Sequence, residues 1–115
     1  MAGSASEVRV THCGVVTFEH GEYKARSGSG NWTVQPIAGF DPPIRAPLGQ
    51  VQISFETPMT SDRYGVIVTP LRTPGVPLLA ANYGDVDANG FVVHLFDPVT
   101  TNTVQNGNFS FAVLS

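Results

Sequence analysis

The sequence has a single cysteine, Cys13, among its 115 residues. One thiol cannot form an internal disulfide, and it cannot build a cysteine-based zinc site, which needs several ligands. Stability must therefore come from packing or from association, and a reducing site of synthesis fits the composition.

Charge is also scarce: only 13% of the residues are charged, and six basic against nine acidic side chains give a net charge of −3. Such a chain offers no basic footprint for a phosphate backbone, so nucleic acid is excluded as the expected partner. Hydrophobic residues make up 42% of the chain, which is too many for a disordered protein.

Long apolar runs are missing, since none approaches the ~20 residues that a membrane-spanning helix needs. Residues 1–7 are small and mostly polar, unlike a basic and then apolar signal peptide. We expect no membrane insertion and no secretion signal, with residues 1–7 forming a flexible N-terminal tail.

No stretch has the apolar spacing of a long amphipathic helix, so strands must carry the fold. The clearest is Gln50–Glu56, in which Val51, Ile53 and Phe55 alternate with polar residues. Further strands are predicted at Val8–Phe18 (with a break at Cys13-Gly14 left open), Trp32–Ile37, Tyr64–Thr69, Leu78–Asn82, Phe91–Phe96 and Asn108–Leu114.

Turn signals separate these segments, among them Arg26–Asn31 and two Asn-Gly pairs, Asn89-Gly90 and Asn106-Gly107. Asn-Gly before an aromatic-rich strand predicts a hairpin, because both residues tolerate positive φ. The last two predicted strands are apolar on both faces, which indicates cover on both sides. The chain is expected to be one all-β domain spanning residues 1–115, a sandwich or small barrel, with 39–48 an extended Pro-rich segment.

The order of four segments resembles the distal β-domains of bacteriophage tail fibres and the related H-type lectin sandwiches. The segments are Gly49-Gln-Val-Gln-Ile-Ser-Phe-Glu-Thr-Pro-Met59, Arg63-Tyr-Gly-Val-Ile-Val-Thr69, Asn89-Gly-Phe-Val-Val-His-Leu-Phe96 and Asn106-Gly-Asn-Phe-Ser-Phe-Ala-Val-Leu114, with Cys13–Phe18 matching the opening strand. The resemblance implies an antiparallel β-sandwich of about six to eight short strands, of jelly-roll or H-type lectin-like type.

That resemblance further implies a virion location, after synthesis in the host cytoplasm. The resemblance implies a homotrimer or hexamer, and a homotrimer is expected, which contacts other virion proteins and binds a host-surface glycan or protein. Residues 19–48 are longer and richer in proline than in the family pattern, and no N-terminal adaptor is visible. Two alternatives therefore stay open: a capsid decoration protein that stabilises the phage head, and a stand-alone carbohydrate-binding domain.

Asp85-Val-Asp-Ala-Asn-Gly90 matches the first half of an EF-hand calcium loop, which makes Asp85, Asp87 and Asn89 a calcium candidate. The second half fails, because Phe96 stands where the bidentate Glu would be. A polar hairpin turn is the favoured interpretation, and no cofactor or metal is expected.

Aromatic residues with polar groups in polar turns are the best candidates for ligand contact. We expect any recognition surface to include Tyr64, Arg63, Tyr83, Asp85 and Asp87, whereas Trp32 is expected to pack in the core or an interface.

Catalytic patterns are absent from the sequence: there is no Gly-x-Ser-x-Gly elbow, and the nine acids form no privileged pair. His12 adjoins Cys13, so on a strand the two side chains would point to opposite faces. The chain is expected not to be an enzyme.

Overall fold

The computed structural model describes residues 8–35, 49–72, 78–99 and 103–115. The expected tail at 1–7 and the expected Pro-rich arm at 39–48 lie outside these residues. Within the described part every regular element is a strand: β1 (Val10–Glu19), β2 (Glu22–Ser29), β3 (Trp32–Gln35), β4 (Gln50–Phe55), β5 (Gly65–Leu71), β6 (Ala80–Asp87), β7 (Gly90–Asp97), β8 (Thr103–Val104) and β9 (Asn108–Leu114).

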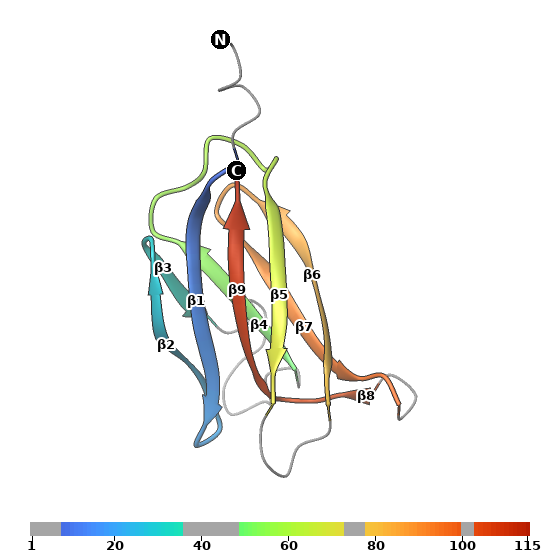
Figure 1. Ribbon diagram of the computed structural model, residues 1–115. Helices are drawn as coiled ribbons and strands as arrows, with labels where there is room; N and C mark the ends of the chain where they lie inside the picture. Colours follow the sequence, from blue (N-terminus) through green and yellow to red (C-terminus); the bar gives the residue numbers. More distant parts are fainter. Residues whose placement is uncertain (1–7, 36–48, 73–77, 100–102) are drawn as a thin grey trace.

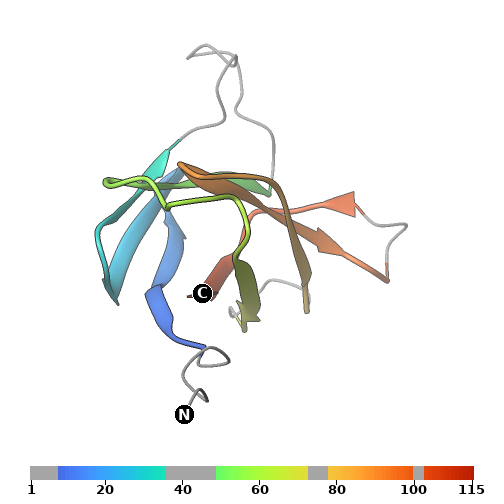
Figure 2. The same ribbon diagram turned by 90° about the horizontal axis from the view of Figure 1, so that it is seen from above.

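The strands form two antiparallel sheets packed face to face (Figures 1 and 2). Sheet A has the order β2-β1-β9-β5, and sheet B has the order β3-β4-β7-β6. The short β8 pairs with β7 at Phe96 and Asp97, beyond the residues of β7 that pair with β4. The expected all-β antiparallel sandwich is thus confirmed. None of the described residues forms a helix that could cross a bilayer.

The core lies between the sheets and is built by strict alternation along the central strands. In β9, Phe109, Phe111 and Val113 point inward, and β4 contributes Val51 and Ile53 in the same way. Each fully buried side chain of this size contributes roughly 1.5–3 kcal/mol through the hydrophobic effect. Eleven buried residues make up the cluster: Val16, Val51, Ile53, Phe55, Val66, Phe91, Val93, Leu95, Phe109, Phe111 and Val113.

β1 runs without a break through Cys13-Gly14, where the sequence left an interruption open. Gly14 faces inward and is buried under the indole of Trp32. The Trp32 Nε1–H donates to the Cys13 carbonyl oxygen at 3.1 Å, and the ring meets Phe111 edge-on at 4.8 Å. Trp32 therefore packs against the core, as expected.

β2 replaces most of the turn that was predicted at Arg26–Asn31. The chain actually reverses at His20-Gly21, where both residues have positive φ (53° and 82°), and β2 then pairs with β1 as an edge strand. The prediction was wrong because β2 is largely exposed and lacks the apolar alternation that marks a strand.

Only one of the two Asn-Gly signals forms the hairpin that was predicted. Ala88-Asn89 turns the chain between β6 and β7, as expected. Asn106-Gly107 instead carries the chain from sheet B to sheet A, because β8 pairs with β7 and β9 pairs with β1 and β5. β5 also continues through Pro70, which an edge strand tolerates.

Candidate binding surfaces

Tyr64 and Tyr83, both predicted to contact ligand, lie at one end of the sandwich on a chain of aromatic rings. Tyr64 meets Phe55 edge-on at 5.5 Å, and Tyr83 meets Phe91 edge-on at 6.3 Å. Phe55 and Phe91 are themselves 6.0 Å apart. The structure thus places the two tyrosines on the rim of the core rather than on a free-standing turn.

The Tyr64 hydroxyl lies 2.8 Å from the carbonyl oxygens of both Asp87 and Gly90, and these two acceptors share its single proton. Burial raises the pKa of Tyr64 to about 12, with further contributions from the charges of Asp87 and Asp62 and from Tyr83. The polar group that was expected to reach a ligand instead fastens the loop before β5 to the β6–β7 hairpin.

Asp87 stabilises the hairpin turn itself. Its Oδ1 accepts hydrogen bonds from the backbone N–H groups of Asn89 at 2.7 Å and Gly90 at 3.1 Å. Asp85, with φ of 50°, lies in the irregular part of the β6–β7 pairing. These contacts support a polar hairpin turn, while calcium binding by Asp85, Asp87 and Asn89 stays a prediction. Among the described residues, no three His, Cys, Asp or Glu side chains come together as a metal site.

The remaining predicted contact residues are open to solvent. Tyr83 is 39% exposed, and Arg63, Asp85 and Asp87 are exposed as well. The Arg63 backbone N–H donates to the Ser61 hydroxyl at 3.1 Å. The five residues therefore share one end of the molecule, where a rigid hairpin carries acidic groups beside one accessible aromatic ring.

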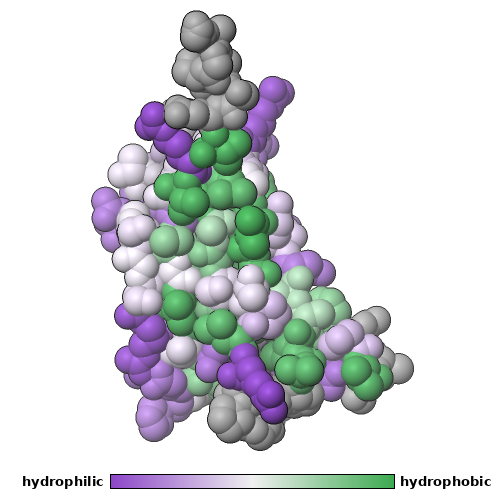
Figure 3. Space-filling model, in the orientation of Figure 1, coloured by the Kyte–Doolittle hydropathy of each residue, from purple (hydrophilic) through white to green (hydrophobic). Residues whose placement is uncertain are grey.

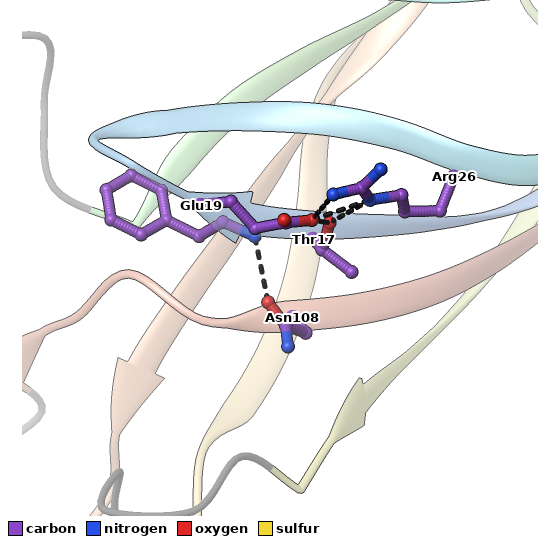
Figure 4. A network of polar contacts seen from close by, with 5 residues as sticks. Thr17, Glu19, Arg26 and Asn108 are labelled. Carbon is purple, nitrogen blue, oxygen red and sulfur yellow. Dashed lines mark hydrogen bonds and ion pairs between the residues drawn. The ribbon is translucent and has the colours of Figure 1, made fainter.

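The opposite end of the molecule is held by two polar networks. In the first, shown in Figure 4, Arg26 of β2 reaches Glu19 and Thr17 of β1, and Asn108 Oδ1 accepts from the Phe18 backbone N–H at 2.8 Å. Hydrogen bonds from Arg26 and then Thr17 lower the pKa of Glu19 to about 2. This network stabilises the β1–β2 hairpin at its exposed surface.

In the second network, Asn106 Oδ1 accepts from the Gly49 backbone N–H at 2.7 Å and from the Tyr23 hydroxyl at 3.2 Å. The Gly107 backbone N–H donates to the same hydroxyl at 3.3 Å. Burial raises the pKa of Tyr23 to about 12. Asn106 thus joins β2, the start of β4 and the crossover into β9, which explains why its Asn-Gly pair does not form a hairpin.

Part of the outer side of sheet A is apolar, which the sequence indicated through Ala112 and Leu114. The rest of that side is polar, with Thr69 paired to Ser110 and with the contacts of Arg26. Register places Leu114 opposite Val10 and Gly65, and Ala112 opposite Cys13 and Ile67. Val10 is 57% exposed and Ile67 is 53% exposed. Figure 3 views this side and shows apolar residues gathered on its upper half, around the end of β9, with more polar residues below them. We call this surface the apolar face: Val10, Cys13, Val15, Ile67, Ala112 and Leu114.

The outer side of sheet B has a different chemistry, because it carries side-chain amides beside the apolar Val92 and Phe96. Register places Gln52 between Gln35 and Val92, and it places His94 between Gln50 and Asn82. These positions point away from the core, since Ile53, Val93 and Leu95 alternate with them and are fully buried. We call this surface the amide face: Gln35, Gln50, Gln52, Asn82, Val92, His94 and Phe96.

Alternation predicts the outward positions of β4 and β7 one strand at a time, but it does not group them into a surface. The missing information was the cross-strand register, which brings Gln35 of β3 beside Gln52 of β4. Alternation alone says which residues share a face of one strand, and it says nothing of which strand lies next to it.

Comparison of the chain with protein-family models, with curated proteins and with solved structures finds no significant match.

Proposed function

We propose that the chain is a non-enzymatic structural domain of a bacteriophage virion, which assembles as a homotrimer and binds a host-surface glycan or protein. The observation that carries the assembly step is the apolar face of sheet A. The core cluster lies between the sheets and does not include the residues of this face, and Val10 and Ile67 on it stay more than half exposed in the single chain.

An exposed apolar surface on β1, β9 and β5 favours association with other protein chains. A contiguous surface of this kind on a regular sheet suits identical neighbours, because most soluble oligomers are symmetric homo-oligomers. Burial of Ile67 and Val10, each more than half exposed, removes apolar area from water at about 25 cal/mol per Å².

The virion assignment draws on the order of the strands. The four segments that resemble tail-fibre and H-type lectin-like domains coincide with β4, β5, β7 and β9, which are the strands that build the core. An exposed domain of this kind acts by contact, and its partners are its own copies, other virion proteins and the host surface.

Sedimentation of the purified chain tests the assembly step. We expect a trimer at micromolar concentration for the natural sequence and a monomer for Ile67→Lys, because a lysine on β5 would have to be buried without a partner. Val99→Lys is the matched control: Val99 is 88% exposed in the β7–β8 turn, away from the apolar face, so this variant should remain trimeric. A monomeric natural chain would overturn the assembly proposal.

Location is tested by immunogold labelling of purified virions with antibody against the chain. Label at the tail tip agrees with the proposed role in host contact. Label spread over the head would overturn that role and would favour a capsid decoration protein, and absence of label from virions would reject the virion assignment altogether.

A further inference from the structure

The amide face of sheet B is the second large surface of the sandwich, and it differs from the apolar face in carrying hydrogen-bonding groups without charge. Its described outward positions on β3, β4, β7 and residues 80–84 of β6 include no Asp, Glu, Lys or Arg, and the one charged side chain at an outward register beyond the β6 bulge is the acidic Asp87, paired with Gly90. The positions without these residues are Thr33, Gln35, Gln50, Gln52, Ser54, Ala80, Asn82, Gly84, Val92, His94 and Phe96.

Two of the amides are held in place by their own strands. The Gln52 Nε2 donates to the Ser54 hydroxyl at 3.2 Å, and the Gln35 Nε2 donates to the Thr33 hydroxyl at 3.1 Å. Gln35 is paired with Gln52 across the β3–β4 ladder, and Thr33 is paired with Ser54. Two parallel amide–hydroxyl pairs therefore stand side by side, at the ~4.8 Å spacing of neighbouring strands.

Each held amide uses one donor and keeps its carbonyl oxygen and a second N–H for another molecule. Because these side chains are already restrained, fewer rotamers are lost when a ligand binds. A group that offers a donor and an acceptor together complements hydroxyl groups, which also act as both.

Apolar side chains lie among the amides on β7. Val92 is only 8% exposed. Phe96 is half-buried and lies on the same side of β7 as His94. Sugars present apolar C–H faces together with hydroxyl edges, and this mixture of aromatic, aliphatic and amide groups complements both.

The same surface is poorly suited to other occupants. An anionic ligand would find no Lys or Arg at the described outward positions, and a protein partner without matching polar groups would leave amides buried and unpaired, at about 1–3 kcal/mol each. We infer that the amide face binds an uncharged, hydroxyl-rich saccharide through Gln35, Gln52 and their neighbours. The inference rests on the proposed function, and it assigns the glycan to sheet B while leaving sheet A for assembly.

The test is a glycan array screened with the labelled full-length chain, followed by NMR titration with the strongest-binding saccharide. We expect neutral oligosaccharides to bind and sialylated or sulfated ones not to bind above background. In the titration, the side-chain amide signals of Gln35, Gln52 and Asn82 should shift. Absence of binding to any neutral glycan, or shifts confined to sheet A or to the Tyr64 end, would overturn the inference.

Substitutions in the amide face provide the second test of saccharide binding. Gln52→Leu keeps the size of the side chain and removes its hydrogen bonds, so affinity for the neutral saccharide should fall about tenfold, the equivalent of one lost hydrogen bond. Ser110→Ala, on the outer side of sheet A, is the control and should bind as the natural chain does. Unchanged affinity in a folded Gln52→Leu protein would reject the site.

The outcomes are separable from those of the proposed function. Sedimentation and virion labelling depend on the apolar face and on location, and neither requires a saccharide. A trimeric virion protein that binds no neutral glycan would leave the assembly proposal standing and remove only this inference.

Discussion

The indole ring of Trp32 occupies the space that a side chain at position 14 would need, so that a Cβ built on Gly14 would lie 2.0 Å from the Trp32 Cζ2. Trp32 begins the first strand of sheet B, whereas Gly14 lies in the middle of β1 in sheet A. The close approach therefore joins the two sheets beside the connection from β2 in sheet A to β3 in sheet B.

Gly14→Ala should destabilise the domain by about 3 kcal/mol, at the upper end of the range for an overpacked core. The ring cannot move freely, because it is fixed by its hydrogen bond to the Cys13 carbonyl and by Phe111. Urea unfolding monitored by tryptophan fluorescence measures the change. Gly84→Ala, where an added Cβ meets nothing within 4 Å, is the control, and equal stability of the two variants would contradict the packing argument.

Tyr64→Phe should lower the free energy of unfolding by about 1 kcal/mol, because it removes the donor from the part-buried contact with the Gly90 carbonyl and from the exposed contact with the Asp87 carbonyl. Tyr83→Phe is the matched control on the same aromatic rim, and it should cost less. Chemical denaturation measures both variants. If Tyr64→Phe unfolds as the natural chain does, the hydroxyl contributes nothing to holding the β6–β7 hairpin.

Stability should fall as the pH drops through the ordinary His pKa of 6.5, because burial lowers the pKa of His12 in the folded chain. The unfolded chain then binds a proton that the folded chain resists, and so unfolding is favoured at acidic pH. His12 stacks on Phe55 at 4.3 Å, so His12→Phe keeps a ring there and removes the titration.

The measurement compares unfolding free energies of the natural chain and His12→Phe at about pH 8 and about pH 5, and Glu19 is present in both proteins, so its contribution cancels. The natural chain should lose more stability on acidification than the variant. Parallel losses in the two proteins would show that His12 is not responsible.

Millimolar calcium should leave the melting temperature unchanged, because Asp87 Oδ1 already accepts two backbone hydrogen bonds in the hairpin turn. Differential scanning calorimetry with calcium and with an equal concentration of magnesium measures the effect. A calcium-specific rise that is lost in Asp85→Asn would instead support the calcium candidate at Asp85, Asp87 and Asn89.

Removal of residues 108–115 should abolish soluble folding, because β9 pairs with β1 on one side and with β5 on the other. The deletion also removes Phe109, Phe111 and Val113 from the core. Ser110→Ala, within the same strand, should express and melt normally. A soluble truncated chain with a cooperative thermal transition would show that sheet A does not depend on β9.

The sequence predicts the strands of the core well, because burial on one face imposes alternation. β9 has the predicted bounds, and β4 differs from its prediction by one residue, at Glu56. Prediction fails where that constraint is weak: β2 is exposed, and β6 extends from Ala80 to Asp87 through a bulge that resembled a polar turn. The conformation of an edge strand depends on the strand it pairs with, and the alternation of apolar residues in its own sequence does not indicate that pairing.

For the candidate surfaces, too, the sequence predicts what depends on one strand and misses what depends on contacts between strands. Tyr64 looked exposed because Asp62 and Arg63 precede it, but its partners lie 23 and 26 residues further along the chain. The apolar face could be anticipated, since β9 is apolar on both sides. The amide face could not, because it combines residues from separate strands whose order in the sheet follows from tertiary packing.

The position of β9 between β1 and β5 also bears on when the domain can form during translation. The ribosome delivers β1 and β5 first, and they cannot pair with each other because the strand that separates them in sheet A is made last. Sheet A therefore cannot be completed before β9 is made. Until then, the edges of β1 and β5 that pair with β9 are unpaired. Pairing of β9 with β1 and β5 as soon as it has emerged would shorten that period.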